Sequence, residues 1–391
     1  MNASRWRPIL LVASAVAGIS AICYAHAHDG RETPRPATHL VGPEVKIGSW
    51  DRKAAAAYLD QRQNWWMQWP KAARDHDTFC VSCHTAVPYA LARPVLGKVL
   101  GEQNPCANER RLLDNVVKRV RLWKEVAPFY SDADRGVYKT VESRGTESVL
   151  NALILASHDA QSGGLSEDTR TALANMWSEQ QTTDNRKGAW LWLRFANEPW
   201  EADDSDFYGA TLAAIAVGMA PGNYQATAEI QPGVAMLREY LNRESTAQPE
   251  FNRIALLWAS TKLSGLLSLK QQRAIIDEIF VKQQADGGWS LTTLAGSWKR
   301  HDGTPQEMHS DGYATGLIVL ALREAGIARE NGLYQAGLTW LRAHQNRAEG
   351  FWPGFSLNKN EEHHISPETA RFMNDAATAY AVLALSASQQ N

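Results

Sequence analysis

The sequence predicts an all-α fold of six helical hairpins, each pairing an amphipathic helix with a more apolar one. Apolar residues recur at intervals of three and four in twelve successive segments, and alternating strand-like runs are few. The second segment of each pair is rich in small apolar residues, as in Ala376–Leu385. A helix that is apolar all round must be buried, whereas one with a single apolar stripe can cover it. We therefore expect two concentric rings, with six inner helices walled by six outer ones.

The hairpins follow one another along the chain at a period of roughly 45 to 65 residues, which is typical of repeat architectures. The amphipathic helices are expected at 51–64, 108–125, 166–181, 230–243, 268–284 and 330–346. The apolar helices are expected at 83–98, 145–158, 206–219, 251–263, 311–325 and 375–388. An open solenoid of the same hairpins is the alternative arrangement.

The N-terminus has the pattern of a secretory signal peptide. Two arginines precede an apolar run over 9–23, and Ala-His-Ala at 25–27 matches a cleavage site. We expect 1–27 to be removed on export to the periplasm, and 28–49 to form a flexible leader before a domain at 50–391. An uncleaved membrane anchor is the alternative, because the apolar run is near the lower length limit for spanning a bilayer. No later segment is apolar enough to span one.

A Cys-Val-Ser-Cys-His run at 80–84 falls where the first amphipathic helix gives way to the first apolar one. Cys-x-x-Cys-His is the attachment signature of c-type haem, in which Cys80 and Cys83 form thioethers and His84 becomes an axial iron ligand. A local disulfide and half of a zinc site are the alternatives, although zinc would need a second Cys/His pair at short spacing. Cys106 is expected to be a packed thiol.

Three junctions between an amphipathic and an apolar helix share a Gln, Gly and Trp in that order. The members are Gln181, Gly188 and Trp190, then Gln284, Gly287 and Trp289, then Gln345, Gly350 and Trp352. Glycine supplies the positive φ that ends a helix, and tryptophan can fill the space between neighbouring hairpins. This pattern resembles the QW motifs of the squalene–hopene cyclase family, whose members share an (α/α)6 toroid with protein prenyltransferases. The resemblance implies a terpenoid cyclase/prenyltransferase-like toroid over 50–391.

The activities of those families do not carry over. The cyclases protonate their substrate with Asp-x-Asp-Asp at an inner helix, and the nearest match here begins with Glu201 and differs in register. The prenyltransferase zinc needs a late cysteine, and none follows Cys106.

Acidic residues recur just before the apolar helices. They are Asp203, Asp204, Asp206, Asp311 and Asp375. Capping or complementing the helix dipole explains this recurrence without catalysis. If acid/base chemistry occurs at the mouth of a central cavity, Asp204 and Asp311 are the candidates.

Three long junctions, 190–206, 289–311 and 352–375, are expected to meet around the motif, since loops of this length are usually functional. They supply the candidates for a second axial ligand. These are Met308, Met373 and His309. A methionine ligand raises the haem potential and suits electron transfer, whereas an open site suits oxygen or peroxide chemistry. His76 could instead pack beside the propionates.

Charge excludes some partners. The formal net charge is −2 and no polybasic run occurs, so nucleic acid and anionic lipid are poor partners. The Glu-Glu-His-His run at 361–364 is expected to be a solvated loop rather than a metal site.

Three functional hypotheses remain. The first is a periplasmic oxidoreductase with haem c, an apolar small molecule in the toroid cavity and a soluble periplasmic electron carrier as partner. The second is a non-catalytic electron-transfer or redox-sensing cytochrome. The third is a haem-free terpene cyclase-like enzyme that uses Asp203 and Asp204.

Overall fold

A computed structural model describes residues 49–359 and 367–386 of the chain. The chain divides into a first unit, Met1–Lys46, and a second unit, Ile47–Asn391. All described residues belong to the second unit, and they are mostly α-helical. The predicted all-α class is therefore confirmed.

Two expectations lie outside the described residues. They are the signal peptide at 1–27 and the acidic and histidine run at 361–364. The expected leader at 28–49 also lies outside them, except for its last residue. Within the described part, no helix is both long and apolar enough to cross a membrane.

Each of the twelve expected helices is present and overlaps its expected range. The amphipathic helices are α1 (Arg52–Gln68), α3 (Ala107–Arg121), α6 (Glu167–Ser178), α8 (Gln231–Glu244), α10 (Leu269–Val281) and α12 (Gly332–Ala343). The apolar helices are α2 (Ala86–Leu100), α5 (Lys139–Ser162), α7 (Ser205–Met219), α9 (Glu250–Lys262), α11 (Gly312–Glu324) and α14 (Phe372–Ser386).

Shorter elements lie in the connections, and the sequence did not predict them. The short helices are α4 (Asp132–Arg135) and α13 (Pro367–Ala370). The 3₁₀ turns span Tyr224–Ala226, Ala228–Ile230, Ser245–Ala247 and Leu291–Leu294. Strands β1 (Ala73–Arg74) and β2 (Thr78–Phe79) pair antiparallel in a small hairpin directly before the Cys-x-x-Cys-His run.

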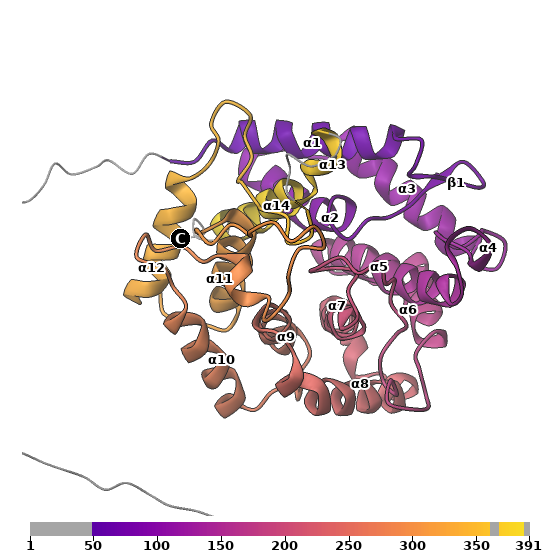
Figure 1. The fold of residues 1–391 in the computed structure, drawn as a ribbon. Coiled ribbons are helices and arrows are strands. Elements are labelled where there is room, and N and C mark those ends of the chain that lie inside the picture. The colour runs from indigo at the N-terminus through magenta and orange to yellow at the C-terminus, as the bar shows by residue number, and fades with distance from the viewer. Residues whose placement is uncertain (1–48, 360–366, 387–391) are drawn as a thin grey trace, which may run out of the picture. The chain divides into compact units, whose positions relative to one another are not determined.

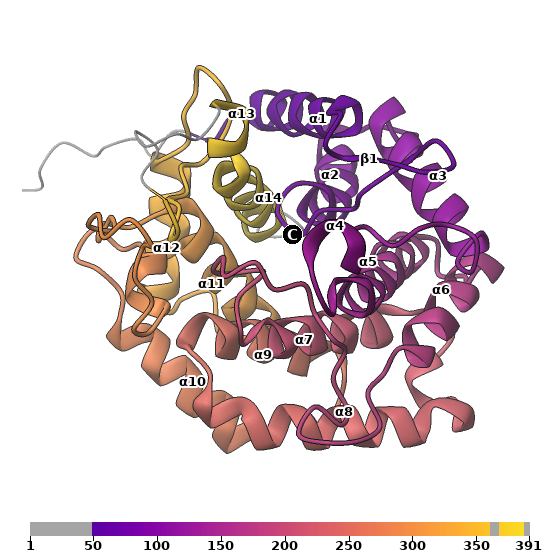
Figure 2. The ribbon, with the colours of Figure 1, turned by 45° about the vertical axis from the view of Figure 1, so that its right-hand side comes forward.

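The apolar helices contact one another in chain order. Helix α2 packs against α5, α5 against α7, α7 against α9, α9 against α11 and α11 against α14, and α14 returns to α2. The amphipathic helices pack on their outer sides, as Figures 1 and 2 show. Burial follows the sequence pattern: every residue of α7 from Ser205 to Val217 is buried, whereas α8 buries a single stripe.

The Gly and Trp positions of the three junctions have the expected geometry. Gly188, Gly287 and Gly350 have φ values of 97°, 89° and 88°. Each junction tryptophan is fully buried and donates its indole N–H to a carbonyl of the preceding amphipathic helix. The pairs are Trp190 with Met176 (2.6 Å), Trp289 with Ile279 (2.8 Å) and Trp352 with Leu341 (2.6 Å).

In two junctions the bridging glutamine lies one residue earlier than the sequence indicated. Gln180 and Gln283 donate Nε2 to the junction glycine carbonyl at 3.1 and 2.8 Å. The expected Gln181 and Gln284 do not take that place, whereas Gln345 does, at 3.0 Å. Each bridging Nε2 also bonds a carbonyl near the start of the next amphipathic helix. These second acceptors are Gly233, Leu333 and, for Gln345, Asp51 at the beginning of α1.

Candidate functional site

The chain approaches the motif through a tightly bonded segment between α1 and α2. The β1–β2 hairpin pairs Ala73 with Phe79 and turns through two residues of positive φ. Cys80 then donates its backbone N–H to Ala72 O at 2.8 Å. Its own carbonyl accepts the indole N–H of Trp66 from α1 at 2.6 Å. Both backbone groups of Cys80 are therefore satisfied, which fixes the position of this residue.

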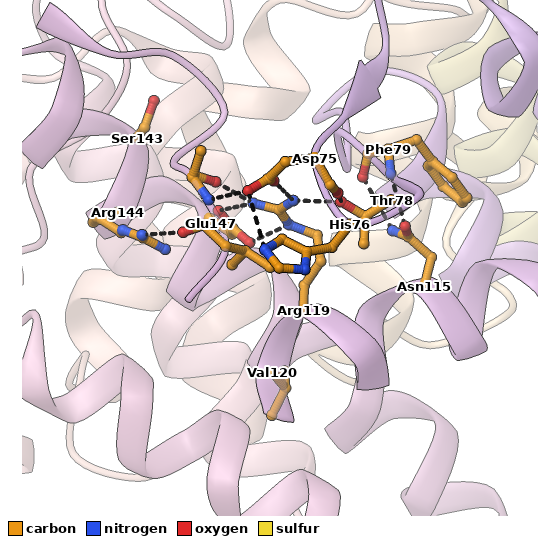
Figure 3. Close-up of polar contacts among 12 residues, drawn as sticks. Asp75, His76, Thr78, Phe79, Asn115, Arg119, Val120, Ser143, Arg144 and Glu147 are labelled. Atoms are coloured by element: carbon orange, nitrogen blue, oxygen red, sulfur yellow. Dashed lines mark hydrogen bonds and ion pairs between the residues drawn. The ribbon is translucent and has the colours of Figure 1, made fainter. Parts of the chain in front are cut away.

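Helix α3 holds the same segment from the other side. The side-chain amide of Asn115 bonds both backbone groups of Phe79, at 2.8 Å to N and 3.1 Å to O. Arg119 donates to Thr78 Oγ1 at 2.6 Å and forms a two-pronged ion pair with Glu147 of α5, at 2.5 and 3.0 Å. Figure 3 shows the Arg119 guanidinium between the hairpin and Glu147. Both ion-pair side chains are fully buried, so α3 and α5 anchor the residues preceding Cys80.

The motif itself forms the turn that starts α2. Ser82 Oγ accepts the backbone N–H groups of Thr85 and Ala86, at 3.2 and 3.0 Å. Cys80 and Cys83 are free thiols, and each is only 6% exposed. Burial raises the pKa of the Cys80 thiol to about 12, and it raises the pKa of the Cys83 thiol well above its ordinary value. Both thiols are therefore protonated at neutral pH.

The imidazole of His84 is enclosed by aromatic rings from three parts of the chain. Phe372 of α14 stacks on it with ring centroids 3.7 Å apart, and Trp66 of α1 meets it edge-on at 5.0 Å. Trp200, from the junction at 190–206, lies 5.7 Å away. Burial, assisted by the charge of Arg62, lowers the pKa of His84 to about 3. The ring is therefore neutral, which is the form of histidine that binds metal.

A polar chain leads away from His84 toward a buried carboxylate. His84 Nδ1 lies 2.9 Å from Thr85 Oγ1, which donates to Asp375 Oδ2 at 2.6 Å. Asp375 lies in the first turn of α14 and is 2% exposed. Its carboxylate also accepts from Tyr58 Oη at 2.9 Å and from Arg62 at 2.7 and 3.0 Å. This residue was expected only as a helix-end acid, and its partners on α1 and α2 could not be read from the sequence.

The three long junctions bond to one another over the motif end of the apolar helices, as predicted. Glu198 N donates to Asn358 Oδ1 at 2.8 Å, which joins the first junction to the third. Gln306 Nε2 donates to Leu357 O at 3.0 Å, which joins the second to the third. His301 Nε2 lies 2.8 Å from Ala196 O, between the second and the first.

The candidates for a second axial ligand differ in their surroundings. Met373 is 4% exposed and directly follows Phe372, whose ring stacks on His84. Met308 is 59% exposed. His309 is exposed and packs its ring against Phe355 at 4.6 Å. Helix α14 therefore brings the residue next to Met373 to the motif, whereas Met308 and His309 make their described contacts elsewhere. His76 is also exposed, in the turn of the hairpin.

The two candidate catalytic acids also differ. Asp311 caps α11: Oδ1 accepts from Ala314 N at 2.9 Å and Oδ2 from Leu291 N at 2.6 Å, which commits both oxygens to structure. Burial raises its pKa to about 7. Asp204 precedes α7 without capping it, and its Oδ2 accepts from Asn252 at 3.3 Å. Its buried Oδ1 has no hydrogen-bond partner among the described residues. Burial raises its pKa as well.

Two further acids at this end were not singled out as site residues. Glu201 is close enough to Cys80 and Cys83 for its charge to act on both thiols, and burial raises its pKa to about 7. Burial, together with Asp204, raises the pKa of Glu198 to about 8. Glu201 stands first in the run compared with the cyclase acid motif. The comparison drew attention to the segment 201–206, but it did not predict that this segment lies near Cys80 and Cys83.

Two cavities of the described region lie at the opposite ends of the apolar helices. One, of about 300 Å³, has an apolar part that includes Leu320, Met219 and Trp258, and a charged edge that includes Lys98, Lys262 and Glu324. A second, of about 380 Å³, adjoins it through Lys98 and Gln161. These lie near the C-terminal ends of the apolar helices, whereas the motif precedes the N-terminus of α2. The sequence led us to expect a cavity that opens beside the motif, whereas these two cavities lie at the other end of the apolar helices.

The types and spacing of the donor side chains at the motif match those that hold a covalently bound haem. Two free thiols separated by two residues precede a neutral histidine within an apolar, aromatic shell. Nearby, the buried ring of Tyr313 meets the indole of Trp200, with ring centroids 5.8 Å apart. Over the same residues, no group of three or more His, Cys, Asp or Glu side chains is placed to hold a metal ion. A c-type haem does not require one, because its iron takes only one or two ligands from the protein.

A scan with protein-family models and a search of curated proteins give no match to this chain.

Proposed function

We propose that this protein is a c-type haem protein of the periplasm or the cell exterior. The observation that carries the proposal is His84: a half-buried, neutral imidazole among aromatic rings, directly after two free thiols at the haem-attachment spacing. Cys80 and Cys83 would form the thioethers, and His84 would be the axial ligand. A haem bound there supplies one-electron redox chemistry. Export through residues 1–27 is part of the same proposal.

The fold proposed with it is an (α/α)6 toroid like that of terpenoid cyclases and prenyltransferases. Two observations support it over an open solenoid. Helix α14 packs against α2, so the last hairpin meets the first. Gln345 also exchanges two hydrogen bonds with the backbone of Asp51, 294 residues away, at 2.6 and 2.9 Å. A solenoid would leave these ends apart.

The experiment is expression of the full chain in a periplasm that contains haem-maturation machinery. A denaturing gel stained for haem should show a stained band for the wild type and for Cys106→Ala. The stain should disappear in Cys80→Ala/Cys83→Ala, because no thioether can form. An unstained wild type, or an equally stained double variant, contradicts the proposal.

Met373 is the proposed second axial ligand, because it is buried and directly follows Phe372, whose ring stacks on His84. The oxidised wild type should then have a low-spin absorption spectrum. Met373→Ala should convert it to high spin, whereas Met308→Ala, at an exposed position, should leave it unchanged. A low-spin spectrum that persists in Met373→Ala overturns this assignment.

An oxidoreductase acting on an apolar small molecule is favoured over a simple relay by a series of ring contacts. Trp258, in the wall of the 300 Å³ cavity, lies 6.4 Å from Tyr380, which lies 5.3 Å from Tyr313. Tyr313 lies 5.8 Å from Trp200, which contacts His84 at 5.7 Å. The rings connect the cavity with the motif, so a molecule in the cavity can exchange electrons with a group at His84. A soluble periplasmic carrier would be the second partner.

A cavity-filling variant separates the two functions. Leu320 lines the cavity, and Leu320→Trp should slow reduction of the ferric protein by a small apolar quinol, used as a probe. Leu269→Trp, at a residue that is 83% exposed on α10, is the matched control and should react like the wild type. Equal rates in all three proteins would favour the non-catalytic relay.

A further inference from the structure

The hydroxyl of Thr85 stands between His84 and Asp375, and its single hydrogen determines the direction of both contacts. Burial raises the pKa of Asp375, but its two hydrogen bonds from the always-protonated Arg62, at 2.7 and 3.0 Å, keep the carboxylate ionised, so it can only accept. The Thr85 hydrogen must then point to Asp375 Oδ2, 2.6 Å away. Only lone pairs of the Thr85 oxygen remain for His84 Nδ1, at 2.9 Å.

His84 must therefore donate through Nδ1. A neutral imidazole has one N–H, and this contact assigns it to Nδ1, which leaves Nε2 with a free lone pair. The protons on Thr85 and His84 are assigned from the donors and acceptors around the Thr85 hydroxyl. The tautomer that results is the one in which Nε2 is the metal-binding nitrogen.

We propose that Arg62, Asp375 and Thr85 form a positioning chain that fixes the tautomer of His84 and increases the basicity of Nε2 as a ligand. A metal-bound histidine whose other nitrogen is bonded toward a carboxylate is held in orientation and is a stronger donor. The chain joins three elements that are distant in sequence: Arg62 lies on α1, Thr85 precedes α2 and Asp375 lies on α14. The first and last hairpins must therefore pack together before the tautomer and orientation of the His84 ring are fixed. This inference rests on the proposed haem function.

Thr85→Val is the variant that breaks the chain with little change of shape, and Thr85→Ser is its matched control because the hydroxyl is kept. Losing the bond to Nδ1 should weaken donation to the iron and favour the reduced state. We expect the equilibrium between oxidised and reduced haem to shift about tenfold toward reduced in Thr85→Val, which is about 59 mV upward in potential for one electron. Thr85→Ser should keep the wild-type potential.

A second readout does not need haem. The full chain, made without maturation machinery and labelled with ¹⁵N-histidine, reports which nitrogen of His84 carries the proton. The wild type and Thr85→Ser should show protonated Nδ1, and Thr85→Val should show a mixture of tautomers. Helix content by circular dichroism confirms that each variant is folded. If Thr85→Val proves unfolded, Asp375→Asn is measured in its place, with the same mixture expected.

The outcomes separate the inference from the function on which it rests. An unstained wild-type band defeats the haem proposal, while the ¹⁵N spectra still show whether Thr85 sets the tautomer. Stained protein whose potential and His84 tautomer are the same in Thr85→Val as in the wild type overturns the positioning chain and leaves the haem proposal standing.

Discussion

The two ends of the apolar helices are built in different ways. At the motif end, three long junctions bond to one another over buried aromatic rings, and the acidic side chains of Glu198 and Asp311 are buried. At the other end the helices stop around an open cavity, whose edge holds the half-buried ion pair of Lys262 with Glu324. The closed end suits the covalent attachment of a group at Cys80 and Cys83 and a fixed orientation of the His84 ring. The open end suits the entry and exit of a small molecule.

The largest expected effect comes from the buried pair that anchors the motif. Arg119→Ala leaves Glu147 charged and unpaired in the interior, which costs about 3–5 kcal/mol of unfolding free energy. Urea unfolding followed by circular dichroism measures it. Arg121→Ala is the matched control on the same helix: its pair with Asp168 is exposed, and no measurable change is expected. Equal losses in both variants would contradict the assigned anchoring role.

A smaller effect is expected at the contact between the last and first hairpins. Gln345→Ala removes the amide that bonds Asp51 and Gly350, leaving backbone groups unpaired, at a cost of about 1–3 kcal/mol. Gln284→Ala is the control, because its amide bonds the Met308 carbonyl and the Ser310 hydroxyl, away from the contact between the last and first hairpins. The difference in urea midpoint between the two variants is the measurement. No difference would mean that Gln345 does not join the hairpins.

The smallest expected effect is a contrast in pH dependence between the two ends. The pKa of Glu201 is raised to about 7 and that of Glu198 to about 8, so the folded state binds protons that the unfolded state has released. Their contribution is fully present below the unfolded value of about 4.3 and is lost as pH rises to about 8. At the cavity end, burial alone would raise the pKa of Glu324, but Arg323 and Lys262 lower it overall, so its contribution is lost on acidification.

Unfolding free energies measured from about pH 3 to about pH 8 test this contrast. The wild type should lose stability toward pH 8. Glu201→Gln, which keeps the shape and cannot ionise, should flatten that slope. Glu324→Gln should leave the alkaline slope unchanged and reduce the loss of stability below pH 5. A slope unaffected by Glu201→Gln contradicts the burial of this carboxyl near the thiols.

Local patterns predicted what depends on local physics. The twelve helices were predictable because burial on one side or on all sides sets the spacing of apolar residues along a helix. The bridging glutamine was placed wrongly at Gln181 and Gln284 because each has a glutamine directly before it, and the residue at which the helix ends decides between them.

Contacts between distant residues escaped prediction. Asp375 and Thr85 are 290 residues apart and meet only because α14 packs beside α2. The cavity position also depended on how side chains of all the apolar helices fill the interior, which no single segment reveals. The Cys-x-x-Cys-His spacing, by contrast, is contained within five residues and identified the candidate site from the sequence.

Mass spectrometry of the protein purified from a periplasm with haem-maturation machinery tests the central claim most directly. The proposal predicts that the peptide containing residues 80–84 carries the added mass of one haem, and that Cys80→Ala/Cys83→Ala carries none. An unmodified peptide from a host whose maturation machinery modifies a known cytochrome in parallel would contradict it.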